Sequence, residues 1–155
     1  MDTSSGQPTV AETLARMDEG WADFRRRVHA LPGQLLEEHV TADSWTRKQM
    51  LAHVATWHEI TVERLSGLVD TGEPQRTPDD EDVVNARAAR AAVGRTTGEI
   101  LLDIEHTYKQ LRRKVARLTD EQLAEHDSWA AAVIAGNSYG HYREHLADLD
   151  PRHSG

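Results

Sequence analysis

Apolar side chains recur at alternating steps of three and four residues along most of this chain, which is the pattern of amphipathic helices packed around a common core. Four stretches follow it, at residues 10–31, 45–69, 96–118 and 129–149. No segment shows the period-two alternation of a half-buried β-strand. The sequence therefore predicts an all-α four-helix bundle.

Turn-forming residues and helix caps separate these stretches. Pro32 and Gly33 end the first helix, because proline disfavours a helical residue before it. Two sequences with the form of capping boxes start the second and third helices: Thr46 with Gln49, and Thr96 with Glu99. Residues 118–127 are expected to turn the chain into the fourth helix, whose first half Gly136 and Gly140 weaken.

A long connection is predicted between helices two and three. It opens with an acidic, turn-rich loop at residues 70–82, which is a candidate cover for a pocket. An Ala/Arg-rich stretch at residues 83–94 follows and predicts a short helix that ends near Gly94. The chain shows no credible domain boundary, so we expect one domain over residues 1–155, with a core at about 8–149 and short flexible ends.

The charge of the chain argues against nucleic acid and membrane partners. Its 26 acidic and 18 basic residues give a formal net charge of −8, so no basic field attracts phosphates or anionic lipids. No apolar run approaches the roughly 18 residues of a membrane span, and the N-terminal stretch lacks the apolar core of a signal peptide. Cysteine is absent, which fits a reducing compartment. We expect a cytoplasmic protein.

Histidines lie at the core-facing edges of the second and fourth helices. At 100° per residue, His53 is about 40° from the apolar Trp57, and His141 and His145 are about 40° apart beside the apolar face of the last helix. Two imidazoles one turn apart can converge on one cation, with His53 of the facing helix as the third ligand. The alternative is a structural role, because this spacing also arises by chance and histidines at a core margin bond to carboxylates or water.

Two segments carry a resemblance to a known family. The stretch "SWTRKQMLAHVATWHEI" resembles the second-helix signature of the DinB-like superfamily, and "AGNSYGHYREHLADL" resembles its closing helix with the H-x-x-x-H pair. The resemblance covers roughly residues 8–149. It implies a DinB-like up-down-down-up four-helix bundle whose three histidines, here His53, His141 and His145, commonly bind a divalent metal ion, often zinc or nickel.

The same resemblance implies a range of activities. DinB-like proteins include thiol transferases that use bacillithiol or mycothiol, a mycothiol-dependent maleylpyruvate isomerase, and proteins that protect cells from their own genotoxins, such as the colibactin self-resistance protein. This chain resembles the last branch and actinobacterial relatives. Some members do not use the metal, so the fold alone does not establish catalysis. Relatives often form dimers, which leaves a homodimer open here.

Three imidazole ligands would leave a tetrahedral ion with one open position, the arrangement of catalytic zinc sites. Water bound there has a pKa lowered to around 7, and a bound thiol ionises more readily still. Because the chain has no cysteine, any sulfur nucleophile must come from a small-molecule thiol such as mycothiol. We therefore expect thiol transfer or hydrolysis on a small electrophilic or hydrophobic substrate, in detoxification, self-resistance or secondary metabolism.

Two other function classes compete with this interpretation. In the first, the protein sequesters a toxic natural product in its inter-helix pocket without turnover. In the second, the protein is structural, with histidines that bind no metal. Loss of turnover on metal removal marks the enzyme, whereas ligand affinity that survives metal removal marks the sequestering protein.

Four further residues are candidates around the ion. Trp57 offers an aromatic wall for substrate, Asn137 an amide for a substrate oxygen, and Glu144 a general base. The alternatives are core packing, helix capping and a solvated charge, respectively. His58 lies about 140° round the helix from His53, too far to share the metal, and is expected to line the pocket or to make a core hydrogen bond.

Overall fold

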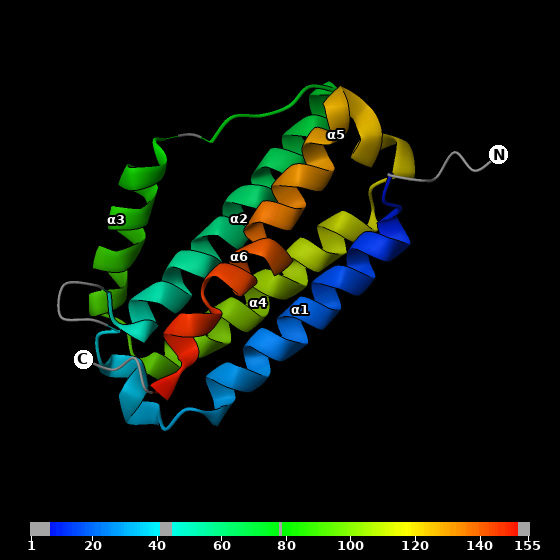
Figure 1. Ribbon diagram of the computed structural model, residues 1–155. Helices are drawn as coiled ribbons and strands as arrows, with labels where there is room; N and C mark the ends of the chain where they lie inside the picture. The colour runs from blue at the N-terminus through cyan, green and yellow to red at the C-terminus, as the bar shows by residue number, and fades with distance from the viewer. Residues whose placement is uncertain (1–6, 41–44, 78, 152–155) are drawn as a thin grey trace.

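Long helices form the bundle that the apolar stripes predict (Figure 1). A computed structural model describes residues 7–40, 45–77 and 79–151, so the expected flexible ends fall largely outside the described residues. The main helices are α1 (Val10–Ala30), α2 (Arg47–Thr71), α4 (Thr97–Ala116) and the consecutive pair α5 (Asp120–Asn137) and α6 (Tyr139–Glu144). α1 packs against α4 and α6, and α2 packs against α4 and α5, which closes a ring. The prediction of an all-α bundle is confirmed.

The connection between α2 and α4 carries a helix of its own. α2 and α4 run in the same direction, so the chain has to return along the bundle between them (Figure 1). The return contains α3 (Glu81–Val93), the short helix that the Ala/Arg-rich stretch predicts. α3 packs on α2, outside the ring of main helices.

Threonine capping boxes start four of the described helices. In the two predicted boxes, the hydroxyl groups of Thr46 and Thr96 accept hydrogen bonds from the backbone N–H three residues on, both at 3.1 Å. Two further boxes start α1 and α5: Thr9 with Glu12, and Thr119 with Gln122. The Thr119 box begins a helical turn within residues 118–127, where the sequence predicted only a connection.

The fourth helix of the bundle is interrupted near its start. Residues 125–128 leave the helical conformation, and three of them have positive φ angles: His126 at 55°, Asp127 at 56° and Ser128 at 62°. Regular helix resumes at Trp129, the residue at which the sequence predicted the last helix to begin. The sequence therefore predicted the connection and the start of the last helix correctly. It did not predict the helical turn that the structure has before the kink.

A second interruption separates α5 from α6. Ser138 has a φ of −130° and a ψ of −108°, and its hydroxyl donates a hydrogen bond to the carbonyl oxygen of Ile134 at 2.5 Å. After Glu144 the chain tightens into the 3-10 helix η2 (Leu146–Leu149). The prediction of one continuous helix to Leu149 is wrong, because these backbone conformations break the regular hydrogen-bond ladder.

The buried apolar residues form one main cluster that draws on all the main helices. Its least exposed members include Met17, Phe24, Leu51, Leu65, Leu111 and Ile134. A smaller separate cluster, made of Trp57, Ile60 and Val84, joins α2 to α3. None of the described helices is both long enough and apolar enough to cross a lipid bilayer.

One charged side chain is completely buried where α2 begins. Arg47 has no exposed surface, although it follows directly on the cap residue of the helix. Its guanidinium donates hydrogen bonds to three backbone carbonyl oxygens: Leu35 at 3.1 Å, Asp148 at 2.6 Å and Asp150 at 3.0 Å. Arg47 thereby ties the 3-10 helix η1 (Gly33–Glu37) and the end of the described chain to α2.

Replacing Arg47 by methionine should lower the unfolding free energy by about 3 kcal/mol or more, because buried carbonyl oxygens lose their donors. Urea unfolding in the presence of a chelator measures this loss. Arg90→Met, on the exposed side of α3, is the control and should change the unfolding free energy by less than about 0.5 kcal/mol. Equal stabilities of the two variants would contradict the tying role of Arg47.

Candidate metal centre

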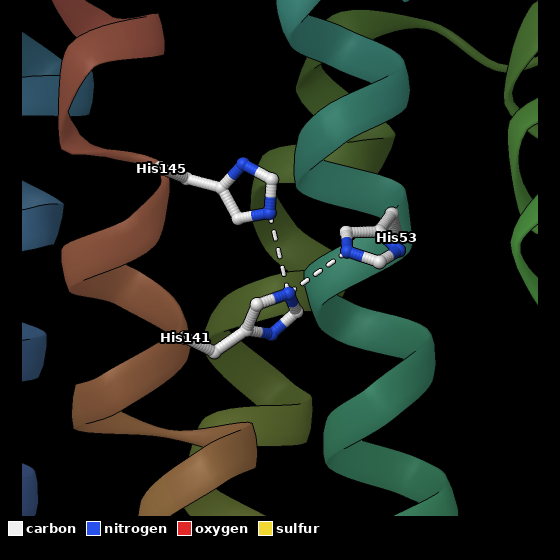
Figure 2. A group of neighbouring side chains, drawn as sticks. All are labelled: His53, His141 and His145. Atoms are coloured by element: carbon white, nitrogen blue, oxygen red, sulfur yellow. Dashed lines mark hydrogen bonds between the residues drawn. The ribbon is translucent and has the colours of Figure 1, made fainter. Parts of the chain in front are cut away.

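The three histidines predicted as ligands meet in one place (Figure 2). His53 projects from α2, His141 lies on α6, and His145 is the residue that caps the end of α6. The Nε2 atom of His141 lies 2.8 Å from Nε2 of His53 and 3.2 Å from Nε2 of His145. His53 and His141 are each only 7% exposed. The three side chains thus offer one nitrogen each to a common point, and this group can hold a metal ion.

The spacing of these nitrogens fits a small divalent ion. Imidazole nitrogens at about 2.0–2.1 Å from a tetrahedral ion lie about 3.3 Å from one another. The two observed separations, 2.8 and 3.2 Å, are slightly shorter than or close to that value. All three nitrogens lie within 4.8 Å of one another. A set of three neutral imidazoles suits zinc, nickel or copper, and it leaves a coordination position for another ligand.

Two of the rings make a hydrogen bond at Nδ1, the nitrogen that faces away from the common point. This leaves the lone pair of the other nitrogen, Nε2, directed at that point. Nδ1 of His53 lies 2.9 Å from Oδ1 of Asn85, and Nδ1 of His145 lies 2.7 Å from Oδ2 of Asp148. Since these oxygens accept, each Nδ1 carries the proton and each Nε2 of the neutral rings presents a lone pair. When all three rings are neutral, only His141 can place a proton among the three Nε2 atoms. Three nitrogens sharing one proton form a better cation site than a hydrogen-bond network.

The buried rings are held in the form that binds metal. Burial, together with the neighbouring His145, lowers the pKa of His53 to about 4. Burial, with the nearby imidazoles of His53 and His145, lowers the pKa of His141 to about 3. Both rings are therefore neutral near pH 7, and a cation meets little competition from protons there. Among the described atoms, Nδ1 of His141 is buried without a hydrogen-bond partner.

Three of the other predicted residues line a cavity beside the histidines. Trp57, Asn137 and Glu144 surround a space of about 210 Å³ together with His53 and His141. The Nε1 of Trp57 donates a hydrogen bond to Asn85 at 2.7 Å, and the ring is 6% exposed. Asn137 donates a hydrogen bond from Nδ2 to the carbonyl oxygen of Val133 at 3.0 Å. Glu144 is exposed at the rim of the cavity.

His58 lies in the core, away from this cavity. It has no exposed surface, and both ring nitrogens have partners: Nδ1 lies 2.8 Å from Oγ1 of Thr107, and Nε2 lies 2.7 Å from the hydroxyl of Tyr142. Burial lowers its pKa to about 3. These contacts fit the core hydrogen bond that the sequence offered for His58. They do not fit the alternative of a pocket-lining, substrate-binding side chain.

Three residues near the histidines were not among those predicted. Asn85 and Glu81 come from α3 and line the cavity, and Asp148 orients His145. The sequence does contain a signal for Asp148, since an acidic residue three positions after a candidate ligand can reach the ring. It contains none for Asn85, because the docking of a short connecting helix does not follow from its periodicity.

The unfolding free energy of the metal-free protein should fall as the pH drops from about 6.5 toward 4. Because the pKa of His58 is about 3 in the folded chain, the unfolded chain takes up this proton first. The contribution of His58 to the unfolding free energy is fully present above pH 6.5. Below pH 6.5, protonation of His58 in the unfolded chain lowers the unfolding free energy by about 1.4 kcal/mol per pH unit.

Urea unfolding with chelator at pH 7, 6 and 5 measures this slope. His58→Gln should flatten it by about 1.4 kcal/mol per pH unit, whereas His106→Gln, at an exposed position, should leave it unchanged. An unchanged slope in His58→Gln would contradict a buried neutral imidazole.

Comparison with known proteins agrees with this geometry. A crystal structure of an uncharacterised protein from Escherichia coli UTI89 is similar in fold, with a TM-score of 0.74, 14% sequence identity and coverage of 94% of each chain. The search of curated proteins found no match. The profile of the DinB superfamily matches residues 16–148, which span α2, α6 and all three histidines. This chain therefore belongs to the DinB superfamily.

Proposed function

We propose that this DinB-superfamily protein binds one divalent metal ion, zinc or nickel, through His53, His141 and His145. The observation that carries the proposal is the convergence of three Nε2 atoms whose rings have few protons to share. Hydrogen bonds from Nδ1 of His53 and His145 favour the tautomers that ligands require. Burial supports the same conclusion, since it keeps two of the rings neutral.

We further propose an enzymatic role for this centre, in thiol transfer or hydrolysis on a small electrophilic or hydrophobic molecule. A divalent ion bound there would supply an open position that acidifies water or a thiol. Trp57 would shield the reacting atoms from water, and Asn137 would orient a substrate oxygen. Glu144 would take up the released proton, since it lies at the exposed rim and can pass the proton to solvent.

The cosubstrate in the transfer reaction would be a small-molecule thiol such as mycothiol, because the chain has no cysteine to supply sulfur. A cavity of about 210 Å³ is smaller than the usual drug-sized pocket, so it would hold the reacting ends of the substrates. The setting we propose is cytoplasmic detoxification, self-resistance or secondary metabolism, carried out by one domain that spans the chain.

The purified, untagged protein should carry about one equivalent of a divalent metal ion after limited dialysis, and the double variant His141→Ala/His145→Ala should carry none. Elemental analysis of both proteins measures this, with circular dichroism as the check on folding. The matched control is His29→Ala/His106→Ala, which removes two exposed imidazoles and should keep the metal. If the unaltered protein binds no metal, even when ions are added back, the proposal is wrong.

Chelation should separate an enzyme from a sequestering protein. Removal of the metal should abolish turnover of an electrophile with mycothiol, bacillithiol or water, and adding the metal back should restore it. Glu144→Gln should lower kcat at least tenfold while keeping the metal, because the variant cannot accept a proton. If ligand affinity survives chelation and no thiol or electrophile turns over, the pocket sequesters its ligand without catalysis.

A further inference from the structure

Asn85 reaches the candidate metal centre from outside the ring of main helices. It lies on α3, and its Oδ1 accepts hydrogen bonds from two side chains of α2: Nδ1 of His53 at 2.9 Å and Nε1 of Trp57 at 2.7 Å. The side chain is half-buried and lines the cavity next to His53. One oxygen atom thus joins the connecting helix to a predicted ligand.

Trp57 determines which way the amide of Asn85 faces. The indole N–H can only donate a hydrogen bond, so the amide has to turn its oxygen and not its NH₂ group toward Trp57. The same oxygen then faces His53, whose Nδ1 must carry a proton to bond with it. With the proton on Nδ1, the lone pair of the neutral ring lies on Nε2. Trp57 and Asn85 together select the tautomer of His53 that can bind a metal ion.

The two hydrogen bonds to Asn85 are also among the few polar ties between α3 and α2. The contact between α3 and α2 otherwise rests on small apolar side chains of α3, such as Val84, Ala88 and Ala89, and on a hydrogen bond from Gln49 to the carbonyl oxygen of Ala89 at 3.1 Å. The cluster of Trp57, Ile60 and Val84 is separate from the main core. Ala92 of α3 does reach the main core, but a helix that buries mostly alanine side chains gains much from additional polar ties.

We infer that Asn85 is a positioning residue for the metal centre, and that through it metal binding and the docking of α3 on α2 stabilise each other. This inference rests on the proposed function, since it needs a metal ion on His53. An ion on Nε2 and a hydrogen bond from Nδ1 require the same tautomer of the ring, so each favours the other. Glu81 lies on the same helix and lines the cavity, so docking of α3 also completes the wall beside the ion.

Zinc affinity of Asn85 variants tests the positioning role. Asn85→Leu removes the acceptor and should weaken zinc binding 10-fold to 100-fold in a competition titration with a chromophoric chelator. Asn85→Asp keeps an oxygen for both donors and should bind zinc within threefold of the parent or more tightly. Trp57→Phe removes the N–H that orients the side-chain amide of Asn85 but keeps the acceptor for His53. It should therefore weaken zinc binding less than Asn85→Leu does. Arg87→Leu on the exposed side of α3 is the control and should bind like the parent.

Amide hydrogen exchange tests the coupling to α3. Adding zinc should slow exchange of the α3 amides at least tenfold in the parent and in Asn85→Asp. In Asn85→Leu the same amides should exchange at nearly the same rate with and without zinc. An unchanged thermal unfolding midpoint of the metal-free protein, followed by circular dichroism, checks that each variant is folded.

The outcomes separate this inference from the proposed function. A parent that binds neither zinc nor nickel contradicts the proposed function itself. A parent that binds zinc, with Asn85→Leu binding it within threefold, overturns the positioning role and leaves the metal centre intact. Weaker zinc binding in Asn85→Leu with full zinc-induced protection of α3 overturns the coupling.

Discussion

The buried guanidinium of Arg47 joins the start of α2 to η1 and to the distant end of the described chain. A buried charge persists in a protein only when polar groups surround it, and here backbone carbonyl oxygens at Leu35, Asp148 and Asp150 do so. The turn that contains Asp148 is therefore fixed against the start of α2. Asp148 in turn orients the ring of His145. The position of one candidate ligand thus depends on an arginine at the start of the helix that carries another.

The candidate ligands differ in how the fold holds them. His53 sits within a 25-residue helix that packs on α3, α4 and α5, and its ring is further bonded to Asn85. His141 and His145 belong to a helix of six residues and its cap, and are held by α1, η2 and Asp148. One side of the site thus lies within a long helix, and the other side lies on a short helix that is positioned by α1, η2 and Asp148.

The sequence predicted the helices and the histidine group because both follow from helix geometry. Apolar stripes gave the bounds of α1, α2 and α4 to within a few residues, and the i,i+4 spacing put His141 and His145 together. The angle around α2 separated His58 from His53. Periodicity could not predict whether His58 lines a pocket or makes hydrogen bonds in the core, as it does with Thr107 and Tyr142. Those partners come from other helices.

Other features depend on packing over long distances, which one helical wheel does not contain. Asn85 reaches the site only because α3 docks on α2. The burial of Arg47 depends on where the two 3-10 helices lie relative to the start of α2. The break at Ser138 depends on a backbone conformation that residue type alone does not impose, although Gly136 and Gly140 on either side weaken the helix there.

That break has a consequence for how such a site can diversify. Gly136 and Asn137, which form one wall of the cavity, end α5, whereas His141 and His145 belong to α6 and its cap. A continuous helix would transmit any rotation or shift of α5 directly to the histidines. With a non-helical residue between them, the wall can change its angle or side chains while the imidazoles keep their places. The same three histidines can in this way lie beside cavities of different shape.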